Sequence, residues 1–453
     1  MATQTAPVMT LYVDLLTEIF DHVLRQDDPW SQPYGPYRWK ALITLTAVCA
    51  FWRSVCLGGP LLWTQIGPEL HNLNIIHLHL ERSDGYPLTI HYRHDPGIGD
   101  TRVLALLAQH SERWLDVTLM FPSSFCTLLS SIKGRLPLLK TLIWISGMDL
   151  DDLQNARNFP GFEVAPSLQR SHLLLPFLKE MIILPWSQLT QLTCEYVHYT
   201  SLHSTLPLMP NLSLLAVRKP VNDLVNAIIP RGVTYPQLLS LEVMDCDFQI
   251  LRSLLHVFPK VDNLTIVVLE KPEPLVLDES TIALPYLSSI HLDVHRYLPG
   301  PLLSRAIQIY APKLSELDFE VARIGDDSKE RDVDLYSPRV VGESMLRFLT
   351  DLIINARCSL RTLKLAFAVD FDCAEMAALF SVTPDLEVLE IAVSHGMECI
   401  PWRSMTPALQ TLPQLKTFDL YIPCTTVEPT TLSDLVAFVR SNNRLDIGFL
   451  CMD

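Results

Sequence analysis

The sequence predicts an α/β protein in which a small N-terminal helical domain precedes an array of repeated strand–helix units. Two observations support this prediction. Apolar residues recur at helical spacings of three and four over the first seventy residues, and short segments of alternating apolar residues recur at a nearly constant interval beyond residue 110. The chain has 453 residues, of which 49% are hydrophobic and 19% charged, so it can bury a large core.

The repeated segment has the pattern L-x-x-L-x-L or a close relative and often follows a turn marked by proline. Its period of two is typical of a short strand with one buried face. The central apolar positions are Leu142, Leu192, Leu215, Leu241, Leu264, Ile290, Leu317, Leu363, Leu389 and Phe418. Seven of the nine successive intervals lie between 23 and 29 residues, and the other two, 50 and 46, are nearly doubled. This is the period of leucine-rich repeats, and an earlier unit is expected at Val117.

Helical patterns lie between several of these strands, at residues 250–258, 301–310, 344–354 and 374–380. Strands that run in one direction and are joined through helices form a parallel sheet with the helices outside. Each unit is too small to bury its own apolar side, so neighbouring units must pack together. We therefore expect an irregular leucine-rich-repeat solenoid over residues 71–453, with a curved parallel sheet and outer helices. It has long excursions at 145–186 and 321–356 and ends in a helix and a strand.

Residues 1–70 are expected to form a helical domain with an inserted loop at 25–39, which is rich in Pro, Gly and Asp. The first helix carries the apolar positions Leu15, Leu16, Ile19, Phe20 and Val23. The stretch VCAFWRSVCLGGPLLW (48–63) is expected to form the third helix and its exit turn. A helix that is apolar nearly all round is normally surrounded by protein. Because so short a domain has a small core, part of this surface should face the next domain or a partner.

Residues 11–66 resemble the F-box-like domain in the form abundant in mushroom-type fungi. The resemblance is carried by Leu11-x-x-Asp14-Leu15-Leu16-x-x-Ile19-Phe20, Val48-Cys49-x-x-Trp52-Arg53 and Pro60-x-Leu62-Trp63. The segments HSERWLDVTLMFP, IKGRLPLLKTL, VAPSLQ and LPWSQLTQL resemble the region that follows the F-box in those proteins, so the resemblance covers most of residues 11–192. In that family the helices dock on the Skp adaptor of a cullin–RING ubiquitin ligase. The resemblance implies adaptor binding by Leu11, Leu15, Leu16, Ile19, Phe20, Val48, Cys49, Pro60 and Leu62.

The resemblance implies a substrate-recognition subunit of an SCF-type ubiquitin ligase, whose repeats bind a target protein. The family usually has proline just after the first leucine, where this chain has Tyr12 and Val13. The chain therefore lacks the fixed backbone angle with which proline favours the start of a helix. One alternative is therefore a non-ligase interaction scaffold with a degenerate F-box, and another is a helical cap that only covers the end of the repeats. An enzyme is not expected, because the sequence has no phosphate-binding loop, dinucleotide-binding, nucleophile-elbow or zinc-protease motif. No cofactor is expected.

Acidic residues recur beside the buried strand positions in the middle and C-terminal strands, and Lys364 is the only Lys or Arg among these variable positions. In a solenoid such positions line the concave face on which partners bind. We expect an acidic platform for a basic segment of the target protein, formed by Glu242, Asp293, Glu316, Asp318, Glu320, Glu390 and Asp419. The alternative is that a chain with a net charge of −15 shows acids on any solvated face.

The same net charge argues against a nucleic-acid or anionic-membrane partner, which would need a basic face. The ten cysteines occur singly and are expected to be buried free thiols of a cytoplasmic or nuclear protein. No signal-peptide pattern and no apolar run of ~20 residues is present. His77 and His79 are expected on one face of a strand within 71–82. A metal site that adds His71 and Glu81 is disfavoured against a half-exposed strand face.

Overall fold

The structure is a computed structural model and describes residues 12–25, 38–67, 70, 72–94, 101–146, 158–222, 234–235, 237–268, 281–294, 303, 307–321, 338–367, 373–393, 409, 411–423 and 446–452. The chain divides into two compact units, unit 1 (Met1–Glu195) and unit 2 (Tyr196–Asp453). Both units are mixed α/β, and each contains its own run of parallel strands.

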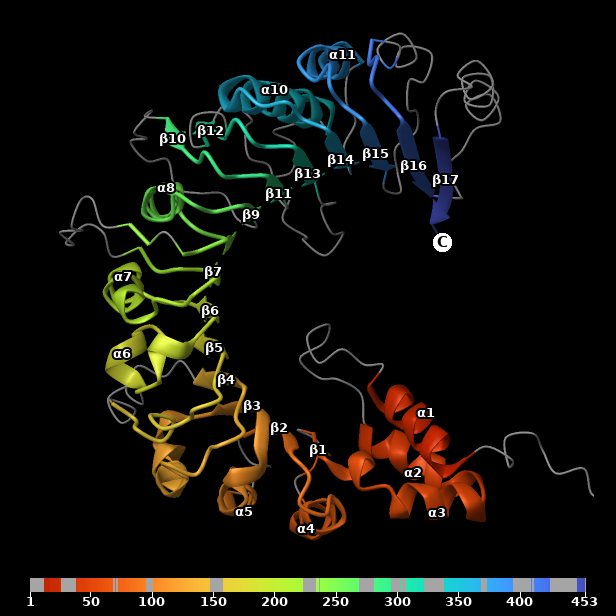
Figure 1. Cartoon of the computed structure of the whole chain (residues 1–453), viewed down its shortest axis with the longest axis vertical. Helices are drawn as coiled ribbons and strands as arrows, with labels where there is room; N and C mark the ends of the chain where they lie inside the picture. Colours follow the sequence, from red (N-terminus) through yellow and green to blue (C-terminus); the bar gives the residue numbers. More distant parts are fainter. Residues whose placement is uncertain are drawn as a thin grey trace, which may run out of the picture. The chain divides into compact units, whose positions relative to one another are not determined.

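Unit 1 begins with helices α1 (Val13–Arg25), α2 (Arg38–Val48) and α3 (Ala50–Gly58) and the 3₁₀ turn η2 (Pro60–Trp63) (Figure 1). The predicted three helices are therefore confirmed. The core between them is formed by Leu16, Phe20, Leu24, Leu42, Val55, Cys56, Leu62 and Trp63. The indole N–H of Trp63 donates to the carbonyl of Cys56 at 2.8 Å, so the only polar atom of this buried side chain is hydrogen-bonded.

The start of the third helix differs from the prediction by two residues, because α3 begins at Ala50 and not at Val48. Val48 is the last residue of α2, and Cys49 has an extended backbone that separates the two helices. The sulfur of Cys49 accepts a hydrogen bond from the N–H of Trp52 at 3.4 Å, which caps α3. Val48 thus does not belong to the third helix.

Within the described ranges of unit 1, six strands pair in chain order and are all parallel: β1 (Gln65–Ile66), β2 (Leu88–Arg93), β3 (Trp114–Phe121), β4 (Thr141–Ser146), β5 (Arg170–Leu174) and β6 (Gln191–Glu195). The connections contain α4 (Leu73–Arg82), α5 (Thr101–Gln109), η3 (Ser111–Arg113), η4 (Ser123–Ile132), α6 (Leu178–Met181) and η6 (Trp186–Gln188).

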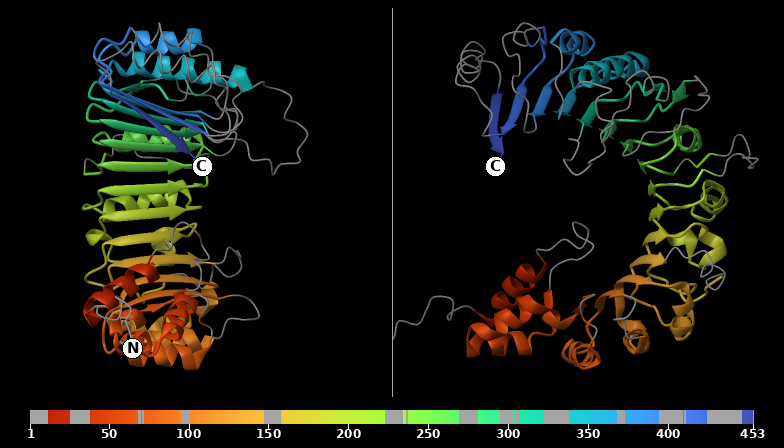
Figure 2. Two further views of the ribbon diagram at one scale, coloured as in Figure 1. Left: turned by 90° about the vertical axis from the view of Figure 1, so that its right-hand side faces the viewer. Right: turned by 180° about the vertical axis from the view of Figure 1, so that it is seen from behind.

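In unit 2 nine described strands form an open parallel sheet: β7 (Leu214–Arg218), β8 (Ser240–Met244), β9 (Asn263–Val268), β11 (Ser289–Val294), β13 (Glu316–Val321), β14 (Thr362–Phe367), β15 (Val388–Val393), β16 (Thr417–Pro423) and β17 (Asp446–Met452). The strand arrows run in one direction (Figure 2). A second sheet pairs β10 (Ile282–Ala283) with β12 (Ile309–Tyr310). The helical elements are α7 (Tyr199–Thr205), η7 (Leu206–Leu208), α8 (Phe248–Val257), α10 (Pro338–Ala356) and α11 (Cys373–Ser381), and α8, α10 and α11 lie on one side of the sheet (Figure 1).

The predicted central residues occupy one equivalent position in successive strands, which confirms the parallel strand–helix array. In unit 2 each of them is the Cα partner of the next, and each is at most 1% exposed: Leu215, Leu241, Leu264, Ile290, Leu317, Leu363, Leu389 and Phe418. Neighbouring residues in each strand alternate between this buried face and the face turned away from the helices. The second face is called the open face below.

The two doubled intervals have different origins. Strand β5 lies inside the predicted excursion 145–186, where Ser171 is the Cα partner of both Leu142 and Leu192. The 50-residue interval therefore contains two units, and the central position of the missing one is a serine. By contrast, β13 pairs directly with β14, so the 46-residue interval is one long unit that contains α10.

Two further elements differ from the prediction. Residues 73–82 form α4 instead of a strand, because Ile76, His79 and Leu80 are buried at helical spacing while His77 is exposed. Of the helix predicted at 301–310, Ile309 and Tyr310 form β12, and most of the remainder lies outside the described residues. The predicted helices at 250–258, 344–354 and 374–380 are confirmed as α8, α10 and α11. The strand predicted at the end is β17, and the helix before it lies outside the described residues.

Cys49, Cys56, Cys126, Cys194, Cys246 and Cys358 are free thiols. Burial raises the pKa of Cys56 to about 11 and that of Cys126 to about 12, which keeps both protonated at neutral pH. Among the described residues, no helix is both long enough and apolar enough to span a membrane.

Candidate partner-binding surfaces

The first candidate surface is an exposed apolar stripe along α1. Tyr12 directly precedes α1, and Leu15, Ile19 and Val23 follow it at spacings of three, four and four, so the side chains of these three lie on one side of the helix. Their exposed fractions are 84%, 43%, 41% and 43%. Single exposed apolar residues are common on protein surfaces, whereas three in line on one helix, with Tyr12 at its start, form a continuous patch.

The stripe lies directly beside the buried face of the same helix. Leu16 and Phe20, each 1% exposed, pack into the core of the three helices, and the Phe20 ring lies 4.8 Å from that of Trp52. Consecutive residues in a helix point about 100° apart, so Leu15 and Ile19 point to one side of this buried face. The apolar arc of α1 is therefore wider than the surface that α2 and α3 cover.

The structure separates the residues predicted to bind the adaptor into two groups. Leu15, Ile19 and Val48 are exposed, Val48 by 56%, while Cys49 and Pro60 are partly buried. Leu16, Phe20 and Leu62 are instead inside the core, each 1% exposed, so they support this surface from below and offer no side-chain area to a partner. Leu11 lies outside the described residues.

Several exposed apolar residues of the N-terminal helices were not included in the predicted adaptor surface. Tyr12 and Val23 extend the stripe of α1 at both ends, and Ile43 on α2 is 46% exposed. The helical spacing from Leu15 and Ile19 gives a signal for Tyr12 and Val23. No signal in the sequence distinguishes exposed Ile43 from buried Leu42, because only the packing of α2 against its neighbours decides which of the two is covered.

The second candidate surface is the open face of unit 2. Its side chains form rows, because Cα partners lie side by side across the strands. The middle row comprises Glu242, Thr265, His291, Asp318, Lys364, Glu390 and Asp419. All seven are partly exposed. Six of the seven predicted target-binding acids lie on strands β8 to β15 of this face, and Asp419 lies on β16.

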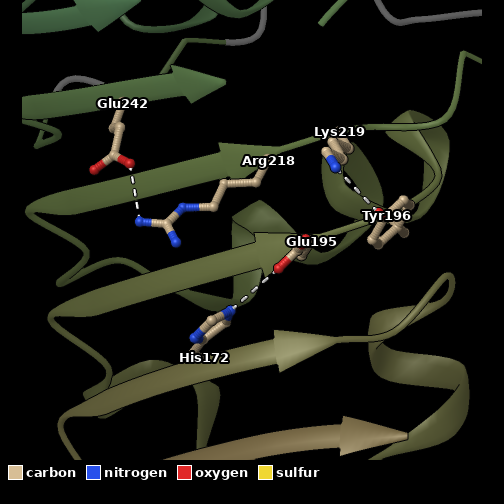
Figure 3. Close-up of polar contacts among 6 residues, drawn as sticks. All are labelled: His172, Glu195, Tyr196, Arg218, Lys219 and Glu242. Atoms are coloured by element: carbon tan, nitrogen blue, oxygen red, sulfur yellow. Dashed lines mark hydrogen bonds and ion pairs between the residues drawn. The ribbon is translucent and has the colours of Figure 1, made fainter. Parts of the chain in front are cut away.

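Several of these acids have cationic neighbours on an adjacent strand. Arg218 donates to Glu242 at 3.1 Å (Figure 3). Lys364 lies 3.4 Å from Glu390, and the imidazole Nδ1 of His291 lies 3.0 Å from a carboxylate oxygen of Asp318. The predicted acidic platform is therefore a charged network in which Arg218 and His291 also take part. Partly exposed pairs of this kind contribute roughly 0–1 kcal/mol each to stability.

The highest density of acids is on β13, where Glu316, Asp318 and Glu320 alternate along the strand. Glu320 is the Cα partner of Asp293 on β11, so two carboxylates are directly opposite each other. Like charges placed in this way destabilise a sheet. A cation that binds here would relieve that repulsion.

The open face of unit 1 has a more even charge. Its strands carry Arg93, Arg170 and His172 together with Asp116 and Glu195. His172 lies 3.8 Å from Glu195 (Figure 3), and Arg170 lies 3.7 Å from Asp116. This face is therefore not a continuation of the acidic pattern found in unit 2.

A short polar contact marks the end of β7. Lys219 and Tyr196 both have left-handed backbones, with φ of +46° and +55°. The Lys219 ammonium lies over the Tyr196 ring at 5.6 Å and donates to its hydroxyl at 3.4 Å (Figure 3). This cation–π pair ties together the turns that follow two strands.

The disfavoured metal site has no counterpart in the described residues. His79 is buried on α4, with its Nδ1 3.1 Å from the carbonyl of Trp63 and its ring 5.2 Å from the Trp63 ring. His77 is exposed, and His71 is outside the described residues. No group of three or more His, Cys, Asp or Glu side chains in the described ranges is arranged to hold a metal ion. The sequence matches no family model and no curated protein.

Proposed function

We propose that this chain is a substrate-recognition subunit of an SCF-type cullin–RING ubiquitin ligase. In this proposal the N-terminal helices are an F-box-like domain that binds the Skp adaptor, and the strand–helix array is a leucine-rich-repeat-like solenoid that binds a target protein. The chain itself supplies binding surfaces, and its ligase partners supply the bond chemistry.

One observation supports this proposal above the others, namely the exposed apolar stripe of α1. An amphipathic helix that lays an apolar face into the groove of a partner is a common recognition mode, with anchors at i, i+3, i+4 and i+7. Leu15, Ile19 and Val23 follow one another every four residues, which also keeps them on one side of the helix, and each is exposed by about two fifths. A helical cap that served only to cover the end of the repeats would have no use for a second apolar stripe that faces solvent.

The open face of unit 2 supports the second half of the proposal. Acidic side chains on parallel strands at a spacing of roughly 4.8 Å suit a flexible cationic segment better than a single small ligand. We accordingly propose that a basic segment of the target protein binds this face, through Glu242, Asp293, Glu316, Asp318, Glu320, Glu390 and Asp419.

The test is co-purification of the full chain with a fungal Skp adaptor. We expect the wild-type chain to retain the adaptor and the Leu15→Asp/Ile19→Asp variant to lose it, because a partner would have to desolvate two carboxylates. Neither residue belongs to the core, so the variant should still fold, which circular dichroism checks.

A matched control is available on a different helix. Ile354→Asp places the same substitution on α10, where Ile354 is 54% exposed, and should leave adaptor binding unchanged. If the wild-type chain fails to retain the adaptor although it is folded, the alternative of a non-ligase scaffold with a degenerate F-box replaces this proposal. Equal retention of the adaptor by the wild-type chain and the α1 variant would contradict the assignment of the stripe.

A further inference from the structure

His291 occupies the centre of the acidic part of the open face of unit 2. Its Cα partners are Thr265 on β9 and Asp318 on β13. Its ring nitrogen Nδ1 lies 3.0 Å from Asp318 Oδ2, and both side chains remain about one third exposed. An imidazole in this position is accessible to protons from solvent and is close enough to a carboxylate to share one.

The charges around His291 come from three strands. On its own strand, Asp293 follows two residues later on the same face. On β13 the acids are Glu316, Asp318 and Glu320, whereas the facing residues of β9, namely Asn263, Thr265 and Val267, carry no charge. The only described cation on the next strand, β14, is Lys364, which lies opposite Asp318 and pairs with Glu390.

These neighbouring charged residues determine how His291 titrates. The hydrogen bond to Asp318 raises the pKa of His291, partial burial opposes the rise, and the nearby charges of Asp318, Asp293 and Glu320 add to it. An ordinary histidine titrates near 6.5, so the transition of His291 is moved towards neutral pH. Because the folded pKa is raised, the stabilisation by the charged pair is complete below the ordinary value and is lost as the pH rises through the raised value.

We propose that the protonation of His291 controls how strongly the open face of unit 2 binds cationic segments. Protonated His291 neutralises one of the four carboxylates around it and competes with a cationic ligand for Asp318. Deprotonated His291 no longer holds Asp318 with a positive charge, so a lysine or arginine of the ligand can displace it from that carboxylate. The face therefore binds a basic segment more tightly above the pKa of His291 than below it. This inference rests on the proposed target-binding role of the face and adds its regulation by pH.

The expected change in affinity follows from the charge of one protonated imidazole acting on one ligand cation at the distance of a neighbouring side chain. At about 6 Å in a solvent-like dielectric, removal of one positive charge strengthens the binding of one cation roughly threefold. Salt reduces this change, because the Debye length at 0.1 M is about 10 Å. The measurement is therefore best made at low ionic strength.

Two measurements on the full chain test the inference. Proton NMR of the histidine rings, with His291 assigned by the missing signal of His291→Gln, should give a pKa above 6.5, and Asp318→Asn should lower it. Fluorescence anisotropy with a labelled octalysine peptide should show that the wild-type affinity rises about threefold between pH 5.5 and 8.5. When the label blocks the N-terminal amine of octalysine, its cations are lysine side chains that stay charged over this range, so the change reports on the protein.

His256→Gln is the matched control, because His256 is exposed on α8 and does not belong to the open face. We expect His256→Gln to keep the rise in affinity and His291→Gln to lose it. An unchanged rise in His291→Gln, or a wild-type chain that does not bind octalysine at any pH in the range, would overturn the inference. The NMR titration does not depend on any partner, and adaptor co-purification tests the proposed ligase role separately, so the two failures are distinguishable.

Discussion

Ser171 allows a quantitative test of the repeat architecture. It occupies the central position of β5 between Leu142 and Leu192, which are both fully buried, and is itself 4% exposed. Its hydroxyl makes no hydrogen bond to another residue of the described chain. Leaving a buried polar group unpaired costs about 1–3 kcal/mol. Ser171→Ala removes this hydroxyl without adding volume, so we expect it to raise the free energy of unfolding.

The net gain should be about 1 kcal/mol, because the loss of one atom from a packed core and the lower strand propensity of alanine offset part of the relief. Ser171→Val adds apolar volume at the same position and should gain roughly a further 1 kcal/mol if the neighbouring side chains leave room. If they do not, overpacking costs about 1–3 kcal/mol. Comparison of the two variants thus measures how much space Ser171 leaves between Leu142 and Leu192.

The assay is urea unfolding followed by far-ultraviolet circular dichroism. The slope of the free energy of unfolding against urea concentration must be the same for all variants, so that the midpoints report stability alone. Leu142→Ala and Leu192→Ala are the matched controls in the neighbouring strands and should each lower the free energy of unfolding by about 2–5 kcal/mol. A loss of about 1 kcal/mol or more in Ser171→Ala would refute the reasoning, because it would show that the hydroxyl is hydrogen-bonded in the folded protein.

Three further predictions concern unit 1. Gly161→Ala should lower the free energy of unfolding by about 1–3 kcal/mol, because the added methyl group would overlap the ring of Phe159. That ring packs between Trp144 and Phe162 and cannot easily move away. Gly161→Ser should lower the free energy of unfolding at least as much in the same urea assay. Trp63→Phe should cost about 1–3 kcal/mol, because the carbonyl of Cys56 loses its buried donor, and a variant as stable as wild type would contradict the importance of that bond. Peptide mapping after maleimide treatment at pH 8 should show Cys49 modified and Cys56 protected. The reason is that burial raises the pKa of the Cys56 thiol to about 11. Early labelling of Cys56 would show that the helical core opens.

The spacing of apolar residues was sufficient to predict most of the strands. Apolar residues at intervals of 23 to 29 residues, with one interval of 46, predicted the central positions from Leu215 to Phe418, and the structure has them as Cα partners in one parallel sheet. This succeeds because a buried position in a parallel sheet requires an apolar side chain, so the requirement is written directly into the sequence. The same signal disappears where the buried residue is polar, and for that reason β5 was missed at Ser171.

The candidate surfaces were predicted less completely. On α1 the sequence identified the apolar positions, but not which of them are covered. Leu15 and Leu16 are chemically identical, yet one is 43% exposed and the other 1%, because α2 and α3 pack against only one side of the helix. On the open face of unit 2 the sequence predicted which strand positions carry acids. It did not predict the ion pairs of Asp318 with His291 and of Glu242 with Arg218, because these depend on which strands are neighbours.

The sequence by itself determined the α/β class, the three N-terminal helices and the repeating strand positions, because these follow from local spacing and from the need to bury apolar side chains. Only the tertiary structure decided which apolar side of α1 faces solvent, that residues 73–82 are helical, and which acids of unit 2 have a cation beside them. Those properties depend on residues that are 20 to 50 positions apart in the chain and come together only through the register of the sheet and the packing of helices.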